Sequence, residues 1–246
     1  MAMKSPFDLE GPEFGPAAGG APKKLVLLLH GLGADGNDLI GLAPHFSRLL
    51  PSAAFVSPNA PFPCDMAPYG YQWFSLQDRD PAAILPGVKA ARPILDAFID
   101  AQLKRFKLME ADTALVGFSQ GTMMSLFTAP RRDKAVAGVV GFSGALVGAE
   151  LLAQEIKSRP PILLVHGDAD TMVPSHASRA AKAALSAAGF SVELHIRPGL
   201  PHGIELNFHA VYYMALPQGL ARGFSAAGKS QCIRLEAARR IGEKTR

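Results

Sequence analysis

The sequence contains very little cysteine. Cys64 and Cys232 are the two cysteines among 246 residues, so a disulfide framework is not expected to stabilise the fold. The cysteines and histidines also lack the spacing that is typical of a zinc site. We therefore expect unpaired thiols and a fold whose stability comes from an ordinary hydrophobic core.

Long apolar runs are absent as well. No stretch approaches the roughly 18 apolar residues that a membrane-spanning helix needs. Residues 1–22 contain acidic residues and prolines where a secretion signal would have an apolar segment. We expect this segment to be a flexible leader, and we expect a cytoplasmic protein without a stable membrane anchor.

Excess charge is absent from the body of the chain. The formal net charge is +4, but residues 221–246 carry a net +5, which leaves −1 for the other 220 residues. The basic end has one aromatic residue, Phe224, whereas nucleic-acid binding favours basic and aromatic residues on one folded face. We expect no nucleic-acid partner, and we interpret residues 217–246 as a solvated basic tail of uncertain structure.

The chain does contain a regular alternation of apolar runs and helical patterns. Near-continuous apolar runs predict strands buried on both faces, as in a parallel sheet, over residues 24–31, 53–60, 113–119, 136–144 and 161–168. Residues 191–198 alternate apolar and polar side chains, which is typical of a half-exposed strand near an edge.

Helical patterns lie between these strands. They cover residues 37–49, 87–107, 120–129, 148–157 and 175–188, and Pro93 predicts a kink or a late start in the second of them. The alternation predicts an α/β fold over residues 23–216, with a mostly parallel sheet, helices on both faces and no large cap domain. In such sheets, ligands bind beyond the carboxyl ends of the strands.

The stretch GFSQG places Ser119 between Gly117 and Gly121. This pattern alone is a weak signal, but a predicted strand precedes it and a predicted helix follows, as a nucleophile elbow requires. The glycines would let the strand and the helix approach closely. We therefore predict that Ser119 is a nucleophile. The similar stretch GFSGA has Ala145 in place of the second glycine, and we interpret Ser143 as structural.

A serine nucleophile needs a histidine base and a carboxylate that orients this base. In enzymes built on such an elbow, the acid and then the base follow the serine along the chain. Asp168 and Asp170 both follow the strand at residues 161–168. Asp170 lies further from the strand and is the predicted acid, whereas Asp168 is expected to bond the turn. His202, in the loop after the last predicted strand, is the predicted base.

The oxyanion of an acyl transfer needs backbone N–H donors as well. One is expected from Gln120, directly after the serine, and the other from the glycine-rich loop within residues 27–38. This loop lacks the glycine patterns of phosphate-binding turns. His30 and His166 stand at strand ends, where we expect them to hold neighbouring loops.

These motifs, taken in order, resemble the phospholipase/carboxylesterase family of α/β-hydrolases, which includes acyl-protein thioesterases and small bacterial carboxylesterases. The similarity extends over about residues 22–204 and rests on LLLHGLGADGNDL, SPNAP, YQWFSL, GFSQGTMMSL, GFSGAL, ILLVHGDADTMVP and GLPHGI. Family members are expected to end soon after the histidine with one amphipathic helix, and residues 205–246 depart from that pattern.

The resemblance implies specific roles for residues of this chain. Ser119, Asp170 and His202 would form the catalytic triad, and the backbone N–H groups of Leu32 and Gln120 would form the oxyanion hole. Residues 60–85 form a long stretch rich in proline and aromatic residues, in which Trp73 matches a motif beside the acyl-binding groove. Four side chains of this stretch are predicted to bind substrate or, alternatively, to pack the loop itself: Phe62, Tyr71, Trp73 and Phe74.

The sequence thus predicts a serine carboxylesterase that cleaves short- to medium-chain esters or thioesters. Its partner is a small-molecule acyl substrate, and the chemistry requires neither a metal nor an organic cofactor. An acyl-protein thioesterase or lysophospholipase is an alternative, as is a dienelactone hydrolase-like enzyme, although those have cysteine as the nucleophile. A non-catalytic α/β-hydrolase that serves as a binding module is a further alternative, and a homodimer is left open.

Overall fold

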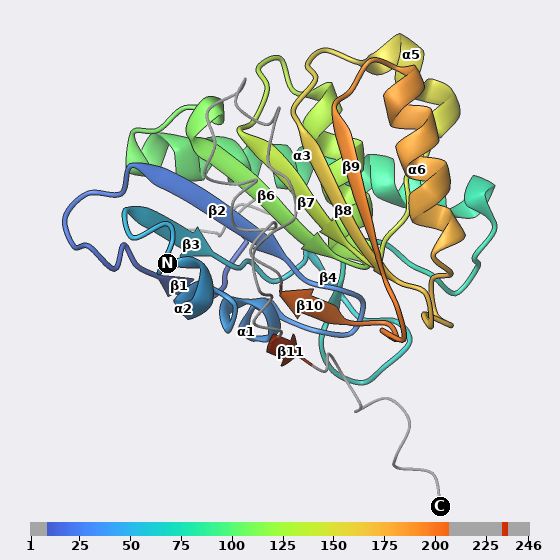
Figure 1. The fold of residues 1–246 in the computed structure, drawn as a ribbon, viewed down its shortest axis with the longest axis horizontal. Helices are drawn as coiled ribbons and strands as arrows, with labels where there is room; N and C mark the ends of the chain where they lie inside the picture. Colours follow the sequence, from blue (N-terminus) through green and yellow to red (C-terminus); the bar gives the residue numbers. More distant parts are fainter. Residues whose placement is uncertain (1–8, 207–232, 236–246) are drawn as a thin grey trace, which may run out of the picture.

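The computed structural model describes residues 9–206 and 233–235, and Figure 1 shows a twisted sheet with helices packed on it. Within these residues the main sheet has seven strands, in the order β1 (Glu13–Phe14), β3 (Ala53–Val56), β2 (Lys24–Leu29), β6 (Thr113–Phe118), β7 (Gly138–Phe142), β8 (Ile162–Gly167) and β9 (Val192–Arg197). All neighbouring pairs are parallel except β1 and β3. The carboxyl ends of the parallel strands therefore meet at one edge.

The strands are buried on both faces, as the apolar runs predict. In β2, Leu25, Leu27 and Leu29 belong to one core, while Val26 and Leu28 belong to the core on the other face. Alternate side chains of a strand point to opposite faces, so a strand covered on both sides must be apolar throughout. Strand β9, by contrast, is an edge strand of half-buried residues, which confirms the prediction from its alternating pattern.

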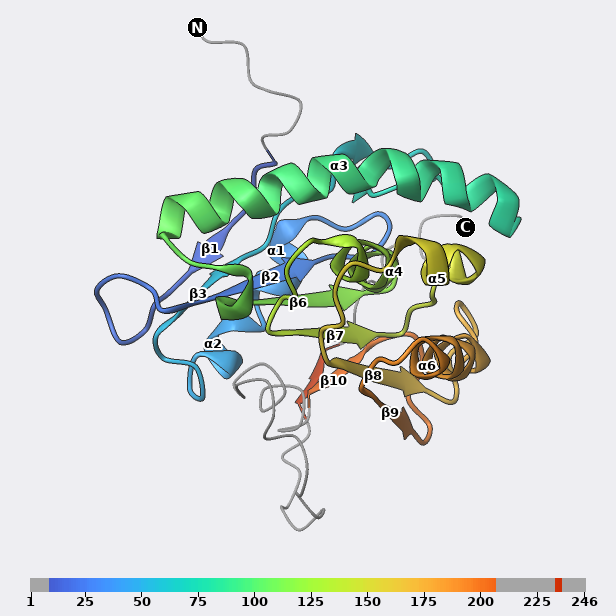
Figure 2. The same cartoon turned by 90° about the horizontal axis from the view of Figure 1, so that it is seen from above.

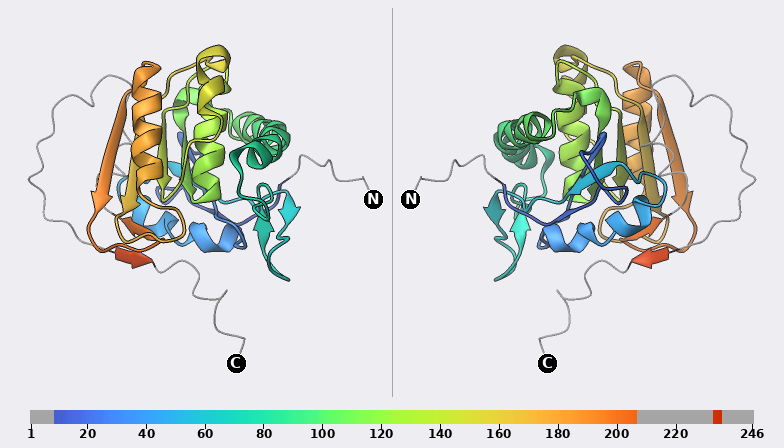
Figure 3. Two further views of the ribbon diagram at one scale, coloured as in Figure 1. Left: turned by 90° about the vertical axis from the view of Figure 1, so that its right-hand side faces the viewer. Right: turned by 90° about the vertical axis from the view of Figure 1, so that its left-hand side faces the viewer.

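Helices cover both faces of the sheet. One face packs against α3 (Pro81–Phe106), α4 (Gln120–Thr128) and α6 (His176–Ala187), and the other against α1 (Gly36–Ile40) and α2 (Ala43–Phe46). Figure 2 shows α4 between α3 and the sheet, and Figure 3 shows α6 beside α4 on the same face. The predicted α/β fold is confirmed, and the described residues include no large cap domain. The remaining helical segments are short: η1 (Glu110–Asp112), η2 (Ala129–Arg131), η3 (Ala149–Leu151) and α5 (Leu152–Glu155).

Helix α3 differs from the helix predicted over residues 87–107. It begins at Pro81, and the side chain of Asp80 caps it by accepting a hydrogen bond from the Ala82 N–H at 2.8 Å. The late start considered for Pro93 is wrong, because the helix continues through Pro86 and Pro93. Each internal proline removes one helical hydrogen bond, and the apolar stripe that α3 buries against the core offsets this loss.

The sheet begins inside the segment that the sequence assigned to a leader. Strand β1 pairs with β3, and the ring of Phe14 lies 6.3 Å from that of Phe55, measured between centroids. Glu13 accepts a hydrogen bond from Arg105 of α3 at 2.9 Å. These contacts hold β1 at the edge of the sheet, while residues 1–8 lie outside the described residues.

The predicted tail over residues 217–246 lies largely outside the described residues. Its described part is β11 (Ile233–Leu235), which pairs antiparallel with β10 (Ile204–Leu206). The structure and role of the remaining tail therefore stay a prediction. None of the helices in the described ranges has both the length and the hydropathy needed to cross a membrane.

A buried arginine joins the outer helix α3 to the end of α4. Only 7% of the Arg132 side chain is exposed, and its guanidinium contacts Asp96 at 2.9 Å, Asp100 at 2.6 Å and Glu110 at 3.4 Å. Burial lowers the pKa of Arg132, but the bonds to Asp100 and Asp96 outweigh this effect and leave the pKa raised. The arginine therefore stays charged and holds three carboxylates, two from α3 and one from η1.

We expect Arg132→Met to lower the free energy of unfolding by about 2 kcal/mol. Removing one partner from a fully buried ion pair costs more, but these carboxylates are partly exposed and would be rehydrated. Urea unfolding would measure the change. The matched control is Lys157→Met, which breaks a solvent-exposed pair with Asp133 and should leave the unfolding midpoint unchanged. Equal midpoints for both variants would contradict the prediction.

Candidate active site

Ser119 lies in the turn between β6 and α4, at the carboxyl edge of the sheet. Its backbone has φ 53° and ψ −114°, a conformation that is strained for a residue with a side chain. The residue is 8% exposed. Such strain persists only where the surrounding structure enforces it, and it is typical of the nucleophile elbow.

The two glycines of the motif enforce this turn. A Cβ atom on Gly121 would lie 1.8 Å from the Leu29 carbonyl oxygen, and one on Gly117 would lie 2.4 Å from the Gly121 carbonyl carbon. Any side chain at either position would push α4 away from β2 and β6. The predicted role of the glycines, which is to allow close approach of strand and helix, is confirmed.

The glycine-rich loop after β2 lies directly against the elbow. A Cβ atom on Gly31 would be 3.3 Å from the Ser119 Cβ. Within residues 9–206, the N–H groups of Leu32 and Gln120 donate to no protein acceptor. Gln120 is the first residue of α4, where a helix leaves its N–H groups without internal partners. Both predicted oxyanion donors are thus free and lie in segments that contact the serine.

His30 holds this loop in place. Its Nδ1–H donates to the Gly31 carbonyl at 2.7 Å, and its Nε2 accepts from the Ala60 N–H at 2.9 Å. The side chain is fully buried, and burial lowers its pKa to about 4. The predicted structural role of His30 is confirmed, because a neutral imidazole satisfies both contacts at once.

The predicted acid and base lie in contact. His202 Nδ1 is 2.7 Å from Asp170 Oδ2, and Asp170 Oδ1 accepts hydrogen bonds from the N–H groups of Met172 and Val173 at 2.9 Å each. The Asp170 side chain is fully buried, whereas 20% of the His202 side chain is exposed. Asp168 accepts a bond from the Gly199 N–H at 2.6 Å. Its side chain thus has a structural contact, as expected, but with the turn after β9 and not with its own turn.

Phe118, the residue before Ser119, packs against His202. The centroids of the two rings lie 4.8 Å apart. No hydrogen bond joins Ser119 Oγ to His202 in the described part of the chain; in unliganded hydrolases this bond is often long and tightens only when substrate binds. The described residues also contain no cluster of three side chains arranged to bind a metal ion.

The side chain of Gln120 binds the aromatic loop, the stretch of residues 60–85, to the elbow. The sequence predicts a role only for the backbone N–H of this glutamine. The side-chain oxygen of Gln120 accepts from the Trp73 N–H at 3.1 Å, and its amide nitrogen donates to the Phe74 carbonyl at 2.7 Å. Trp73 Nε1 donates to the His30 carbonyl at 3.0 Å. We call the two hydrogen bonds of the Gln120 side chain the Gln120 clasp. No local sequence pattern predicts them, because the paired residues are more than 40 positions apart in the sequence.

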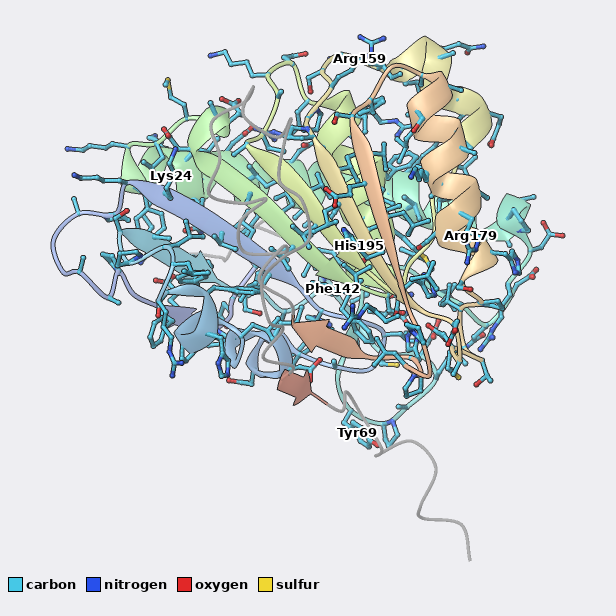
Figure 4. The ribbon with its side chains drawn as sticks, in the orientation of Figure 1. Lys24, Tyr69, Phe142, Arg159, Arg179 and His195 are labelled. Atoms are coloured by element: carbon cyan, nitrogen blue, oxygen red, sulfur yellow. The ribbon has the colours of Figure 1, made fainter. Side chains whose placement is uncertain are left out.

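The four aromatic residues predicted to bind substrate occupy two environments. Trp73 and Phe74 are buried in the core, whereas Tyr71 is half-buried and Phe62 is 37% exposed. Phe62 and Tyr71 belong to a small hairpin of β4 (Phe62–Pro63) and β5 (Tyr71–Gln72). In Figure 4, Tyr69 of this hairpin lies beyond Phe142, which marks the carboxyl end of β7. The hairpin therefore lies on the side of the sheet where a ligand would bind.

A model of the family described as phospholipase/carboxylesterase matches residues 17–210. The chain belongs to this family. It is 30% identical to Esterase YpfH of Escherichia coli over 74% of this chain and 77% of that protein. It is 26% identical to acyl-protein thioesterase 1 homolog 1 of Dictyostelium discoideum over 72% and 82%, respectively.

The crystal structure of esterase PE8 shares 45% identity with this family member, with a TM-score of 0.77 over 80% of this chain and 92% of PE8. The resemblance inferred from the motifs is confirmed, and so is the class of enzyme: this phospholipase/carboxylesterase family member is a carboxylic ester hydrolase. The family implies small-molecule esters or thioesters as substrates.

The buried His30 predicts a loss of stability in mild acid. In the unfolded chain this histidine binds a proton below about pH 6.5, whereas in the folded chain it does so only below about 4. Between these values the unfolded state holds more protons, so stability falls as the pH falls. Urea unfolding at pH 6.5 and pH 5 should show that the wild type loses about 2 kcal/mol more than His30→Gln, which has no titrating ring. Equal losses would contradict the prediction.

Proposed function

We propose that the protein is a serine carboxylesterase that cleaves short- to medium-chain acyl esters or thioesters through Ser119, His202 and Asp170. The observation that supports this most is the 2.7 Å hydrogen bond between His202 and a fully buried Asp170, in loops that follow β9 and β8 at the edge where the strained Ser119 follows β6. This order of serine, acid and base is that of the nucleophile-elbow hydrolases.

In the proposed mechanism, His202 Nε2 takes the proton of Ser119 as the serine oxygen attacks the acyl carbonyl carbon. Asp170 accepts the Nδ1–H of His202, which keeps Nε2 unprotonated and stabilises the imidazolium that forms. The N–H groups of Leu32 and Gln120 donate to the oxyanion. The tetrahedral intermediate collapses, and the leaving alcohol or thiol takes the proton from His202. Water, activated by the same histidine, then hydrolyses the acyl-enzyme.

The aromatic loop provides the proposed acyl-binding wall. Phe62 and Tyr71 would contact the chain directly because they are exposed or half-buried, while Trp73 and Phe74 would set the position of the wall through the Gln120 clasp. The described residues form no cap domain over this edge, and the open acyl groove that we propose here would favour short to medium acyl chains.

The other candidate functions fit the chain less well. The Dictyostelium relative supports a thioesterase, which would use the same residues on a thioester. A dienelactone hydrolase-like enzyme would have cysteine where Ser119 stands. Two properties remain predictions from the sequence: a cytoplasmic location and the lack of a stable membrane anchor. The sequence leaves open whether the protein forms a homodimer.

Replacing Ser119 with alanine should reduce hydrolysis of p-nitrophenyl butyrate to near background, because the proposed reaction begins with attack by the Ser119 hydroxyl. Loss of a triad member typically lowers kcat by about 10⁴-fold or more. The matched control is Ser125→Ala in the same helix, whose hydroxyl donates only to the Gly121 carbonyl and should be dispensable for catalysis. Retained activity in Ser119→Ala would refute the assignment of the nucleophile.

The same pair of variants separates an enzyme from a binding module. A fluorophosphonate probe should label the wild type and Ser125→Ala but not Ser119→Ala. Folded wild type that takes no label would favour a non-catalytic binding protein instead.

The open groove also predicts the chain-length preference. Rates for p-nitrophenyl esters from C2 to C16 should pass through a maximum below C12, because longer chains would extend into water beyond the Phe62 hairpin. A maximum at C12 or longer would contradict an open groove. Parallel assays with acyl thioesters and lysophospholipids would then identify the preferred head group.

A further inference from the structure

A second histidine lies against the acid of the proposed triad. His166, the penultimate residue of β8, has its Nε2 atom 3.2 Å from Asp170 Oδ2, the same oxygen that His202 contacts. Both the His166 and the Asp170 side chains are fully buried. Sequence analysis predicts only that His166 holds a loop, and its contact with the carboxylate goes beyond that role.

The neighbours of His166 determine which ring nitrogen carries hydrogen. Nε2 lies 2.7 Å from the Val173 carbonyl, which can only accept, so Nε2 carries a hydrogen and donates it to that carbonyl. Asp170 Oδ2 lies 3.2 Å from the same nitrogen. Nδ1 is 2.6 Å from the hydroxyl of Ser178, which also lies 3.2 Å from the Gly144 carbonyl. The bond from Nε2–H to Val173 therefore joins β8 to the loop that carries Asp170.

Three hydrogen bonds hold the Asp170 carboxylate. The N–H groups of Met172 and Val173 donate to Oδ1, and His202 Nδ1 donates to Oδ2. The two backbone donors belong to the same short loop as Asp170 and move with it, and His202 belongs to a different loop, after β9. His166 belongs to the central sheet, so its bond to the Val173 carbonyl fixes the loop of Asp170, and with it Oδ2, relative to the strands.

We propose that His166 is a positioning residue whose Nε2–H, bonded to the Val173 carbonyl, holds the loop of Asp170 so that Oδ2 faces His202. This inference rests on the proposed function, because it assigns Asp170 the role of triad acid. His166 touches neither the nucleophile nor the predicted oxyanion donors among the described contacts, so it acts only through the carboxylate. Its loss should therefore lower kcat and leave KM unchanged.

Two amide variants separate this role from simple packing. In His166→Gln the terminal amide reaches the position of Nε2 and keeps a donor toward the Val173 carbonyl. In His166→Asn the amide reaches only the position of Nδ1, so it keeps the contact with Ser178 and loses the donor to Val173. We expect His166→Asn to lower kcat by about 10- to 100-fold with KM within about twofold, a loss similar to that of other outer-shell partners. His166→Gln should recover most of the wild-type kcat.

A spectroscopic readout tests the same contact without turnover. The proton between His202 Nδ1 and Asp170 should give a downfield proton resonance in the wild type, identified by its loss in Asp170→Asn. We expect His166→Asn to shift this resonance and His166→Gln to restore it. Should His166→Asn fail to fold, His166→Met replaces it, since this side chain fills similar space without a donor; a lower kcat and a shifted resonance are then expected.

The outcomes separate the two proposals. Equal kcat in the wild type and in folded His166→Asn, or equal losses in both amide variants that follow their melting temperatures, would overturn the role of His166. If the wild type hydrolyses no ester or thioester, the proposed function fails, and the resonance still shows whether His166 positions Asp170. An unmoved resonance in folded His166→Asn, or in His166→Met where that variant replaces it, would overturn the positioning contact by itself.

Discussion

The contact between α4 and the strands beneath it is the constraint on which the site depends. Gly121 packs against the Leu29 carbonyl so closely that no Cβ atom would fit, and Gly117 packs in the same way against Gly121. This contact keeps Ser119 at a positive φ and brings the N–H of Gln120 to the start of the helix. It also joins the elbow to β2, whose following loop supplies Leu32. The proposed nucleophile and both predicted oxyanion donors thus depend on one backbone approach.

The neighbouring strand repeats the turn for a different purpose. Phe118 and Phe142 are in register on β6 and β7, and the next residue of each strand, Ser119 or Ser143, has a positive φ. Ser143 is fully buried, and its hydroxyl donates to the Gly203 carbonyl, beside His202. Its interpretation as structural is confirmed by these contacts. The same local geometry therefore presents the proposed nucleophile on one strand and supports the histidine loop on the next.

Three histidines near this edge differ in burial more than in position. His30 and His166 are fully buried, and each uses both ring nitrogens in contacts within the protein. His202 uses Nδ1 for Asp170 and has 20% of its side chain exposed. An imidazole can exchange protons with a substrate only where one nitrogen remains accessible, so burial distinguishes the proposed base from the two histidines that hold loops.

The sequence by itself determined the order of the elements and the residues that follow each strand. Apolar runs and helical periods are local properties, and a parallel sheet brings the ends of its strands to one edge, so Ser119, Asp170 and His202 could be assigned from their order alone. Only the tertiary structure decided what surrounds them. The start of α3 at Pro81, the burial of Trp73 by the Gln120 clasp and the contact of His166 with Asp170 depend on partners that the local pattern does not specify. Such contacts form between specific atoms after the chain has packed, and for that reason no local pattern of residues encodes them.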